Sequence, residues 1–511
     1  MPDNAVNNKR IAKNTVMLYF RMFLLLGISL YTSRVVLQVL GVEDYGVYNA
    51  VGGFVAMFGM LSSTLSGAIS RFITVELGKG NTERLRMVFS TSLKVQLLMA
   101  IVVAILAEII GIWFLYNKMQ IPDGRYGAAQ WVLHCSIISF IISLFSVPFN
   151  STIIAHEKMS AFAYISILEA ALKLGIVFLL SSFPVDKLAL YAVLLLSVQT
   201  ILFFIYASYC WKKFEECRGK SQFDKSVFKE IWGFAGWSFF GNTAYVFNTQ
   251  GVNMLMNVYF GVIINAARGI ANQVNGAVNQ FVNNFTMAIN PQIVKSYSAG
   301  NKEDSFRLVC RGAKFSFFLM YVISLPIMLE VDQILEIWLK TPPEGSSAFV
   351  VWTILASMTT VLGCTLLPLI NATGDIKKYQ IMMAVFGFSP FPLTWIAYKL
   401  GAPAIWAYTI YFVVYYILIY VRLWLVHNKT GIPYSMYLKE AVLRTHITGA
   451  LALILPLAVV KLMEPSIARL FITSGVSVVS CGAVMMAIGF TQSERNKIEK
   501  KAKDIFKKFS F

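Results

Sequence analysis

About fourteen apolar stretches, each long enough to cross a lipid bilayer, follow one another along this chain of 511 residues. Hydrophobic residues make up 57% of the chain and charged residues only 14%, against roughly 25% in soluble proteins. A membrane span must satisfy its own backbone polar groups, so we expect every stretch to be an α-helix. The short connections between the stretches leave no room for a soluble catalytic domain.

We place the spans at 14–38, 45–72, 87–115, 128–153, 160–182, 188–211, 231–259, 263–292, 310–330, 348–371, 379–399, 404–426, 441–461 and 468–490. The longest connection is charged and follows six spans, so it is the natural boundary between two halves. The expected organisation is an N-terminal six-helix lobe over 1–211, a cytoplasmic linker over 212–230, a C-terminal six-helix lobe over 231–426, two appended helices over 427–490 and a basic cytoplasmic tail over 491–511. The fold class is therefore an all-α polytopic membrane protein.

The net charge of +18 arises from 44 Lys and Arg against 26 Asp and Glu. Outside the spans these cations are divided unequally, with about 28 on one side of the membrane and roughly six on the other. This asymmetry predicts that both termini are cytoplasmic, and it explains the charge without a nucleic-acid partner. The tail places Ile498, Ala502, Ile505 and Phe509 between lysines, which favours either an amphipathic helix on anionic membrane lipids or a solvated basic tail.

An internal repeat appears when the sequence is shifted by 220 positions. Gly41-Val42 then aligns with Gly261-Val262, and Lys94 aligns with Lys314. There are about nine identities over positions 41–94, more than composition alone would give. Because six spans separate the copies, we expect two parallel lobes related by an axis along the membrane normal, with a central cleft between them.

A polar stripe runs along the predicted span 263–292, where polar side chains recur at a mean spacing of about 3.7 residues and so share one helix face. The stripe consists of Arg268, Asn272, Asn275, Asn279, Asn283, Thr286 and Asn290. Such amides either join helix to helix or line a water-filled cleft, where they suit hydrogen bonding to sugar hydroxyl groups.

About ten Lys and Arg residues lie within the predicted spans, where each costs about 2.5–3.5 kcal/mol at the bilayer centre. Arg21, Lys173 and Arg268 are the deepest, Arg34, Lys94 and Lys314 are intermediate, and Arg71, Arg422, Arg444 and Arg469 are close enough to span ends to snorkel. Acidic partners are few: Glu169 lies one turn before Lys173 and could neutralise it, and Glu108 is another candidate. We infer a cationic, amide-lined cavity that suits a phosphate with a polar appendage.

Other site types find no support in the sequence. The six cysteines form no CxxC pair, the four histidines are isolated, and no phosphate-binding P-loop motif occurs. The first apolar segment is too long for a cleavable signal and is interpreted as a retained span. We therefore expect no cofactor, no metal and no enzymatic turnover.

Several short motifs occur together with these spans. They are Tyr31–Arg34 with Leu40–Gly46, Arg71-Phe72 with Gly78–Asn81, Asn248–Gly251, Asn265–Gly269, Asn290–Gln292 and Ser298–Gly300. In this combination the chain resembles the bacterial polysaccharide transporter family, the Wzx-type flippases of lipid-linked oligosaccharides. That family is part of the multidrug/oligosaccharidyl-lipid/polysaccharide (MOP) flippase superfamily. The resemblance covers nearly the whole chain and is strongest over 14–94 and 231–311.

The resemblance implies alternating access, with an undecaprenyl-diphosphate-linked oligosaccharide carried across the bacterial cytoplasmic membrane for surface polysaccharide or O-antigen biosynthesis. By position, Arg34 resembles a cavity arginine of lipid II flippases. We add Arg21, Lys173 and Arg268 from their depth and Asn272, Asn275, Asn279 and Asn283 from the stripe as substrate-binding candidates. Glu169 and Glu108 are candidates for coupling to H⁺ or Na⁺, and we expect a monomer.

Two other functions are weighed against the flippase. A cation-coupled multidrug antiporter would have the same architecture, but such proteins resemble twelve-span chains, often with an acidic first span, whereas this first span carries Arg21 and Arg34. A membrane glycosyltransferase or polymerase would need paired carboxylates beside a sizeable extracytoplasmic loop. The longest candidate loop, 331–347, is too small for a catalytic fold.

Overall fold

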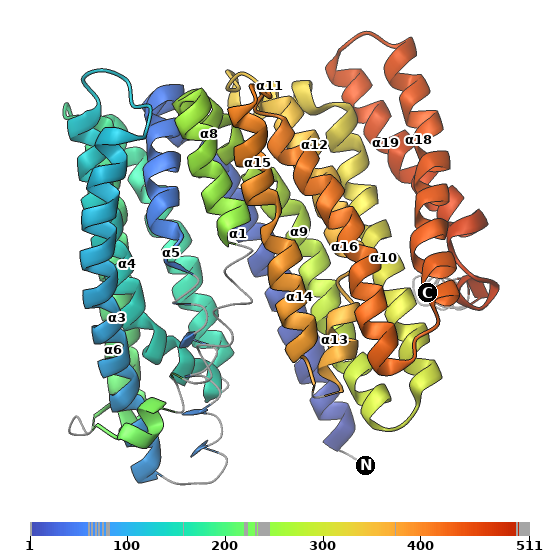
Figure 1. The fold of residues 1–511 in the computed structure, drawn as a ribbon, viewed down its shortest axis with the longest axis horizontal. Helices are drawn as coiled ribbons and strands as arrows, with labels where there is room; N and C mark the ends of the chain where they lie inside the picture. Colours follow the sequence, from blue (N-terminus) through green and yellow to red (C-terminus); the bar gives the residue numbers. More distant parts are fainter. Residues whose placement is uncertain are drawn as a thin grey trace, which may run out of the picture. The chain divides into compact units, whose positions relative to one another are not determined.

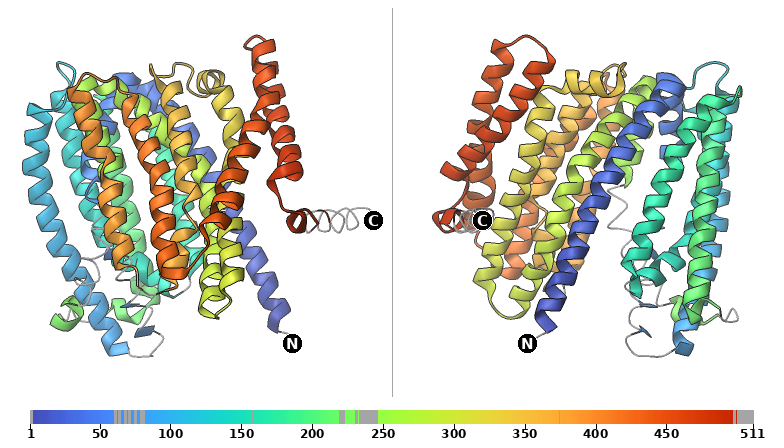
Figure 2. Two further views of the ribbon diagram at one scale, coloured as in Figure 1. Left: turned by 45° about the vertical axis from the view of Figure 1, so that its right-hand side comes forward. Right: turned by 180° about the vertical axis from the view of Figure 1, so that it is seen from behind.

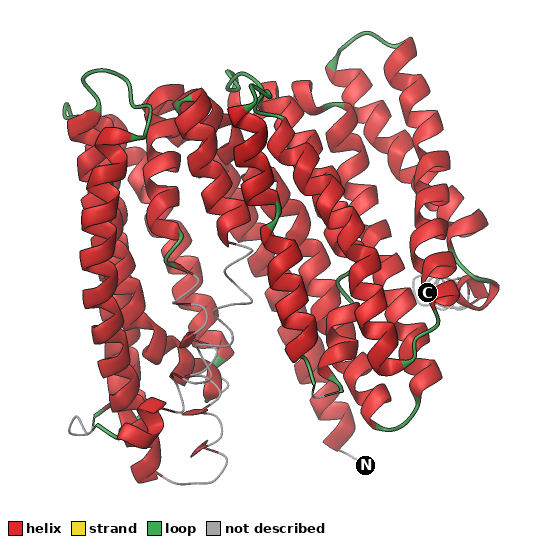
Figure 3. Cartoon of the chain, in the orientation of Figure 1, coloured by secondary structure: helices red, strands yellow, loops and turns green. Residues whose placement is uncertain are grey.

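The computed structural model describes residues 3–59, 82–156, 158–218, 223–229, 246–373 and 375–496, with shorter pieces at 62, 65–66, 69, 72–73, 76–77, 232 and 499. Side chains are described from residue 24 onward, with a few exceptions. Within these residues the regular structure is helical throughout and contains no strand (Figure 3). Ten of the helical stretches are long and apolar enough to cross a membrane, which confirms the predicted all-α membrane class.

The chain forms two compact units. Unit 1 comprises Met1–Gly269 with Thr394–Ala404, and unit 2 comprises Ile270–Leu393 with Ile405–Phe511. The lobes predicted over 1–211 and 231–426, and the central cleft predicted between them, stay predictions.

Unit 1 is built from long helices around an apolar core. Its main elements are α1 (Asp3–Ala56), α3 (Thr82–Asn117), α4 (Tyr126–Ala155), α5 (Met159–Ser182), α6 (Lys187–Lys213), α8 (Val252–Phe260) and the first residues of α9 (Val262–Ser298). Helix α4 packs along both α3 and α6 (Figure 1). Val51 and Phe54 of α1 are buried in this core together with Val103 of α3 and Leu133 of α4. Burial of such side chains, each worth about 1.5–3 kcal/mol, holds the helices in place.

The predicted repeat is visible in the backbone at two glycines. Helix α1 consists of two helical segments joined at Gly41, where φ is 80° and ψ is 172°. Gly261 joins α8 to α9 with φ 79° and ψ −172°, and it lies 220 positions further along the chain. Both positions need a glycine, because other residues rarely adopt this positive φ. The two copies therefore break their paired spans with the same turn.

Equivalent positions of the two copies also touch inside unit 1. Asn49 and Gly269 are 220 positions apart, and a Cβ atom added to Gly269 would lie 2.9 Å from the Oδ1 atom of Asn49. Nearby, Gly46 lets α1 approach the carbonyl group of Val262 so closely that an added Cβ would collide with its oxygen.

Unit 2 contains the remaining helices. They are the rest of α9, α10 (Lys302–Leu329), α11 (Val331–Leu339), α12 (Ser346–Leu362), α13 (Leu366–Asn371), α14 (Lys377–Phe388), the start of α15 (Pro390–Lys399), α16 (Trp406–Thr430), α17 (Tyr434–Tyr437), α18 (Arg444–Leu462) and α19 (Ile467–Val484). Helices α18 and α19 form a hairpin that packs against α10 (Figure 2). Two predicted spans are interrupted, 348–371 between α12 and α13 and 379–399 between α14 and α15.

Among the residues that the structure describes, three segments of π-helix interrupt the ordinary helical spacing. They are Phe247–Gly251 before α8, Leu438–Leu443 before α18 and Met485–Gly489 after α19. A π turn is rare and is frequently found at functional sites. The three segments lie beside Arg268, before Arg444 and ahead of Glu494, respectively.

The predicted spans agree with the helices in most places. The span predicted over 128–153 lies within α4, and the span over 188–211 lies within α6. The segment 331–347, expected as a loop, contains the short helix α11. Parts of the spans 45–72 and 231–259, and the amphipathic helix expected near the C-terminus, lie outside the described residues.

Candidate functional site

Unit 1 contains a cavity of about 730 Å³ between α1, α4, α5 and α6. Fifteen of its 23 lining residues are polar, and eleven of these carry a hydroxyl group, so we call it the hydroxyl cavity. The polar lining residues are Ser29, Thr32, Ser33, Tyr45, Tyr48, Ser62, Ser143, Ser146, Asn150, Ser166, Glu169, Lys173, Tyr191, Gln199 and Tyr206.

The serine hydroxyls of this cavity are compatible with membrane helices because they also bond to their own backbone. Ser146 donates to the carbonyl of Ile142 at 3.1 Å, and Ser166 donates to that of Phe162 at 2.7 Å. A serine that donates to the carbonyl one turn earlier commits its proton there and presents its oxygen as an acceptor. The cavity wall is therefore rich in hydrogen-bond acceptors.

Two predicted site residues, Lys173 and Glu169, meet in the hydroxyl cavity. The Nζ atom of Lys173 lies 2.6 Å from Oε1 of Glu169, as the spacing of one helical turn predicts. The side chains keep 46% and 36% of their surface exposed, so both remain reachable from the cavity. They are the only charged residues of the described lining, and their charges cancel.

Unit 2 contains a second cavity, of about 400 Å³, which we call the amide cavity. It lies among α9, α12, α13, α14 and α16. Its lining consists of Asn279, Val282, Asn283, Thr286, Thr360, Val361, Gly363, Cys364, Leu367, Tyr379, Gln380, Met383 and Arg422. Asn279, Asn283 and Thr286 of the predicted polar stripe thus face open space.

The stripe of α9 combines both roles that the sequence left open. Asn275 joins α9 to α12, because Ser357 donates to its Oδ1 atom at 2.8 Å. Asn279 donates to that same atom at 2.8 Å from within α9, and it also lines the amide cavity with Asn283. Asn272 is exposed and lines neither cavity.

Arg422 of α16 is the one charged residue in the described lining of the amide cavity, and sequence analysis did not select it. Its Nε atom is buried and has no hydrogen-bond partner among the described residues. Gly363 makes room for the guanidinium group, since a Cβ atom at that position would lie 2.8 Å from Nη1 of Arg422. No spacing in the sequence connects Arg422 with the amides of α9, so no local signal could have found it.

Arg268, a predicted site residue, lies inside unit 1 and lines neither cavity. Its exposed fraction is 6%, and its Nη2 atom donates to the carbonyl oxygens of Thr249 at 3.0 Å and Asn248 at 3.5 Å. Both carbonyls belong to the π-helical segment Phe247–Gly251. The widened turn supplies carbonyl groups that stabilise the buried guanidinium.

The remaining predicted site residues are dispersed. Arg34 is half-buried on α1 and lies outside the lining of both cavities. Arg21 also belongs to α1, but its side chain lies outside the described part of the structure. Glu108 of α3 contacts His134 of α4, with 2.8 Å between Oε1 and Nδ1. It does not line the hydroxyl cavity.

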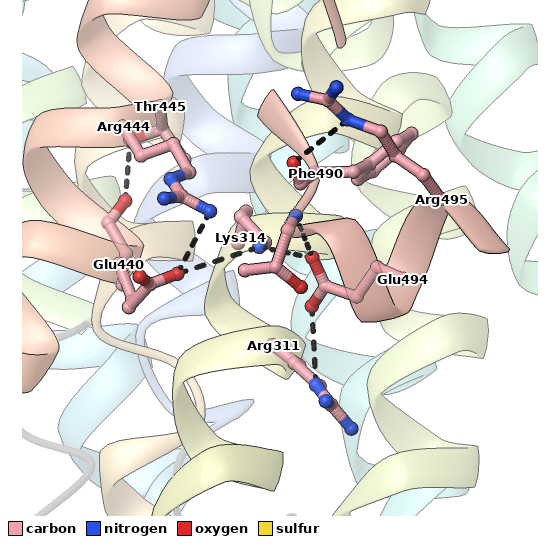
Figure 4. A network of polar contacts seen from close by, with 10 residues as sticks. Arg311, Lys314, Glu440, Arg444, Thr445, Phe490, Glu494 and Arg495 are labelled. Carbon is pink, nitrogen blue, oxygen red and sulfur yellow. Dashed lines mark hydrogen bonds and ion pairs between the residues drawn. The ribbon is translucent and has the colours of Figure 1, made fainter. Parts of the chain in front are cut away.

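The buried cation Lys314 is neutralised by two glutamates that sequence analysis did not connect with it. Its side chain is 1% exposed, and its Nζ atom lies 2.6 Å from Glu494 and 3.9 Å from Glu440 (Figure 4). Glu494 also lies 3.2 Å from Arg311, and Glu440 lies 3.1 Å from Arg444. This network ties α10 to the segments before α18 and after α19.

The carboxyl group of Glu494 is adapted to this environment. Burial alone raises its pKa, but the hydrogen bonds from Lys314 and from the backbone N–H of Thr491 outweigh that effect and lower the pKa below its ordinary value.

A second buried ion pair holds the far end of α10. There Nη2 of Arg469 lies 2.8 Å from Oε2 of Glu330, and Thr473 donates to Oε1 at 2.8 Å. The α18–α19 hairpin is thus fastened to α10 at two places.

Comparisons with known proteins identify the fold. The MatE family model matches residues 18–180. The lipid II flippase MurJ, in an inward closed conformation, is similar with a TM-score of 0.68 and 13% identity over 93% of this chain and 98% of that chain. An inward-facing multidrug resistance MATE family transporter of the MOP superfamily is similar with a TM-score of 0.62 and 14% identity over 79% of this chain and 94% of that chain.

A MOP superfamily transporter from Pyrococcus furiosus, reported with a binding pocket of reverse polarity, gives a TM-score of 0.56 and 14% identity over 81% of this chain and 95% of that chain. No curated protein matches the sequence. The chain therefore has the fold of the membrane transporters and flippases of the MOP superfamily.

Proposed function

We propose that the protein flips an undecaprenyl-diphosphate-linked oligosaccharide across the bacterial cytoplasmic membrane for surface polysaccharide or O-antigen biosynthesis. The observation that carries the proposal is the hydroxyl cavity, in which membrane helices line about 730 Å³ with eleven hydroxyl groups. A volume in the range of roughly 300–1,000 Å³ is typical of ligand sites. Sugar hydroxyl groups donate hydrogen bonds, and the cavity wall is rich in acceptors. A lipid tail would stay in the bilayer while the glycan passes through.

Lys173 and Glu169 have complementary roles in this proposal. The ammonium group of Lys173 is a point charge that suits a diphosphate, and its partial exposure leaves it accessible. Binding of the coupling ion, H⁺ or Na⁺, at Glu169 would release Lys173 from its partner and make it available to the cargo. Arg21, Arg34 and Arg268 remain proposed contributors in other states of the transport cycle, and we propose a monomer that needs no cofactor or chemical turnover.

The fold comparisons are compatible with a lipid-linked cargo and with a small drug. The lipid II flippase matches 93% of this chain, and the MATE transporter matches 79%. A shared fold at such low identity does not by itself carry a substrate from one protein to another. The hydroxyl cavity therefore remains the main support for the proposal.

The second candidate is a cation-coupled multidrug antiporter. It is favoured by the MatE family model, which matches residues 18–180 and thereby includes Lys173 and Glu169. A drug antiporter would export lipophilic cations, and it would not need a diphosphate-binding cation.

The two candidates are separated by transport in proteoliposomes. We expect the purified protein to flip a fluorescent undecaprenyl-diphosphate-linked oligosaccharide and not to export a lipophilic cation. Lys173→Gln should lower the flipping rate about tenfold or more, because it removes a charge-assisted hydrogen bond. Lys187→Gln is the matched control, since Lys187 is exposed at the start of α6 and outside the cavity lining. Cation export without flipping would support the antiporter and contradict the flippase.

A further inference from the structure

We propose that the amide cavity is an anion-binding site in which Arg422 holds a phosphate or carboxylate group. The inference goes beyond the proposed function, because an anion could bind in unit 2 whether or not the cargo is a glycan. It rests on the charge of the lining, on the state of the guanidinium group and on the donors beside it.

The lining of the amide cavity carries a net positive charge. Among the thirteen lining residues Arg422 carries the only charge, and no carboxylate accompanies it. A full charge on a membrane-spanning helix is expensive when nothing compensates it. A bound anion would provide that compensation inside the cavity.

Arg422 differs in this respect from the described cations of the predicted spans other than Arg34, which lines neither cavity. Lys173 has Glu169, Lys314 has Glu494 and Glu440, Arg469 has Glu330, Arg444 has Glu440, and Arg268 has the carbonyls of Thr249 and Asn248. Lys94 lies over the ring of Phe223, at 5.6 Å from its centroid. Arg422 has no ion pair with any described residue, and its buried Nε–H group has no acceptor among them.

The surroundings of Arg422 suit an oxyanion. Asn283 and Gln380 bring amide groups to the lining, and Tyr379 brings a hydroxyl group, so each can donate a hydrogen bond. The guanidinium fork matches the two oxygens of a carboxylate or phosphate. Gly363 keeps the space beside Nη1 open, so the fork is not covered by a side chain at that position.

The native thiol of Cys364 reports on this site, because it lines the same cavity. We would treat the purified full-length protein in lipid nanodiscs with an anionic thiol reagent, 2-sulfonatoethyl methanethiosulfonate. A parallel sample would receive the cationic 2-(trimethylammonium)ethyl methanethiosulfonate. Mass spectrometry of the peptides would give the modification rate of Cys364 separately from that of Cys217, which lies in unit 1 and serves as the internal reference.

The expected result is a preference of Cys364 for the anionic reagent. Arg422→Gln should reduce the ratio of anionic to cationic rates about tenfold, because a unit charge a few ångströms away dominates the local potential. Arg422→Lys should retain most of the ratio, and the ratio at Cys217 should stay unchanged in every variant. An unchanged ratio in Arg422→Gln would overturn the proposal. So would a Cys364 that neither reagent modifies in the unaltered protein, because the cavity would then be closed to solutes.

Protection experiments identify the class of anion. Inorganic diphosphate that slows modification of Cys364 by a neutral maleimide would indicate a phosphate site. Glucuronate that protects while diphosphate does not would indicate a carboxylate site, such as an acidic sugar would occupy. Both effects should vanish in Arg422→Gln, and glucose serves as the neutral control. Failure of both anions at tens of millimolar, or equal protection by glucose, would overturn the proposal.

These outcomes are independent of the proposed transport function. Anion protection at Cys364 in a protein that does not flip the labelled glycan would retain the site and refute the flippase. Normal flipping together with a charge-insensitive Cys364 would do the reverse.

Discussion

In the hydroxyl cavity of unit 1, Lys173 lies 2.6 Å from the carboxylate of Glu169, whereas Arg422 in the amide cavity of unit 2 has no carboxylate in its described lining. The first cavity is larger and presents mainly hydroxyl groups, and the second combines amides with an uncompensated charge. The difference shows that the number of intramembrane cations says little about a cavity until their partners are known. A neutral wall suits a hydroxyl-rich solute, and a cationic wall suits an anion.

The largest expected effect is on the free energy of unfolding. It compares Lys314, which has carboxylate partners, with Arg422, which has no described partner. Lys314→Met leaves the buried carboxylate of Glu494 and the half-buried carboxylate of Glu440 without their central cation, which should cost about 3–5 kcal/mol. Arg422→Met removes a charge that has no described partner, so the free energy of unfolding should stay the same or rise. Thermal unfolding of both variants in the same detergent gives the comparison. Equal losses in the two variants would mean that Arg422 is also neutralised within the protein.

The second prediction converts the hydroxyl cavity into a cationic one. Glu169→Gln removes the counter-charge of Lys173, so a cysteine introduced by Ser166→Cys should then favour the anionic thiol reagent about tenfold more than before. The double variant Glu169→Gln/Lys173→Gln is the control and should return the ratio to its starting value. A ratio that ignores Glu169 would show that the ion pair does not set the potential of this cavity.

The third prediction moves the charge of Arg422 without removing it. In Gly363→Ala the new Cβ atom would lie 2.8 Å from Nη1, so the flexible end of the arginine must shift. We expect the anionic preference at Cys364 to change by a few-fold, with thermal stability nearly unaffected because only a flexible side-chain end has to move. Gly475→Ala is a matched helical control, since a Cβ there meets no atom within 4 Å. An unchanged preference would place the reporting charge elsewhere.

The smallest expected effect is a loss of stability at acid pH. It involves the ion pair between Lys314 and Glu494 and does not involve Arg422. The pKa of Glu494 is lowered in the folded protein, so its carboxylate stabilises the fold above the ordinary glutamate pKa of about 4.3. That stabilisation should be lost as the pH falls toward the lower folded-state pKa. Melting temperatures measured between pH 7 and pH 3 should therefore fall more steeply for the unaltered protein than for Glu494→Gln. Parallel curves would contradict the assignment.

The positions of the helices could largely be predicted from the sequence, because apolar length is a local property. The segments joined at Gly41, for example, agree with spans predicted to end near 38 and to begin at 45. The contact between Lys173 and Glu169 was predictable for the same reason, since one helical turn separates them. Residues 220 positions apart were related only through the repeat, which the matching turns at Gly41 and Gly261 support.

The partners of the other cations depend on tertiary packing and were not predictable. Glu494 reaches Lys314 from 180 positions away, and Glu330 reaches Arg469 across 139. Arg422 was predicted to snorkel because it lies near a span end. In the structure the packing of α14 and α16 places it in the same cavity lining as the amides of α9. The tyrosines of the hydroxyl cavity were missed because aromatic residues are common throughout the spans. A weak signal existed in the recurrence of Ser29, Thr32 and Ser33 along α1.

The three π turns give this protein a way to rotate side chains without unwinding a helix. A π turn holds one residue more than an α turn, and each residue corresponds to about 100° of rotation. If such a turn moves along the helix by one peptide, the residues that it passes swing to a new face while the hydrogen-bonded column stays intact. The π turns lie beside Arg268, before Arg444 and ahead of Glu494, where the charged partners described above are held. Sliding of a turn would exchange those partners in a single step.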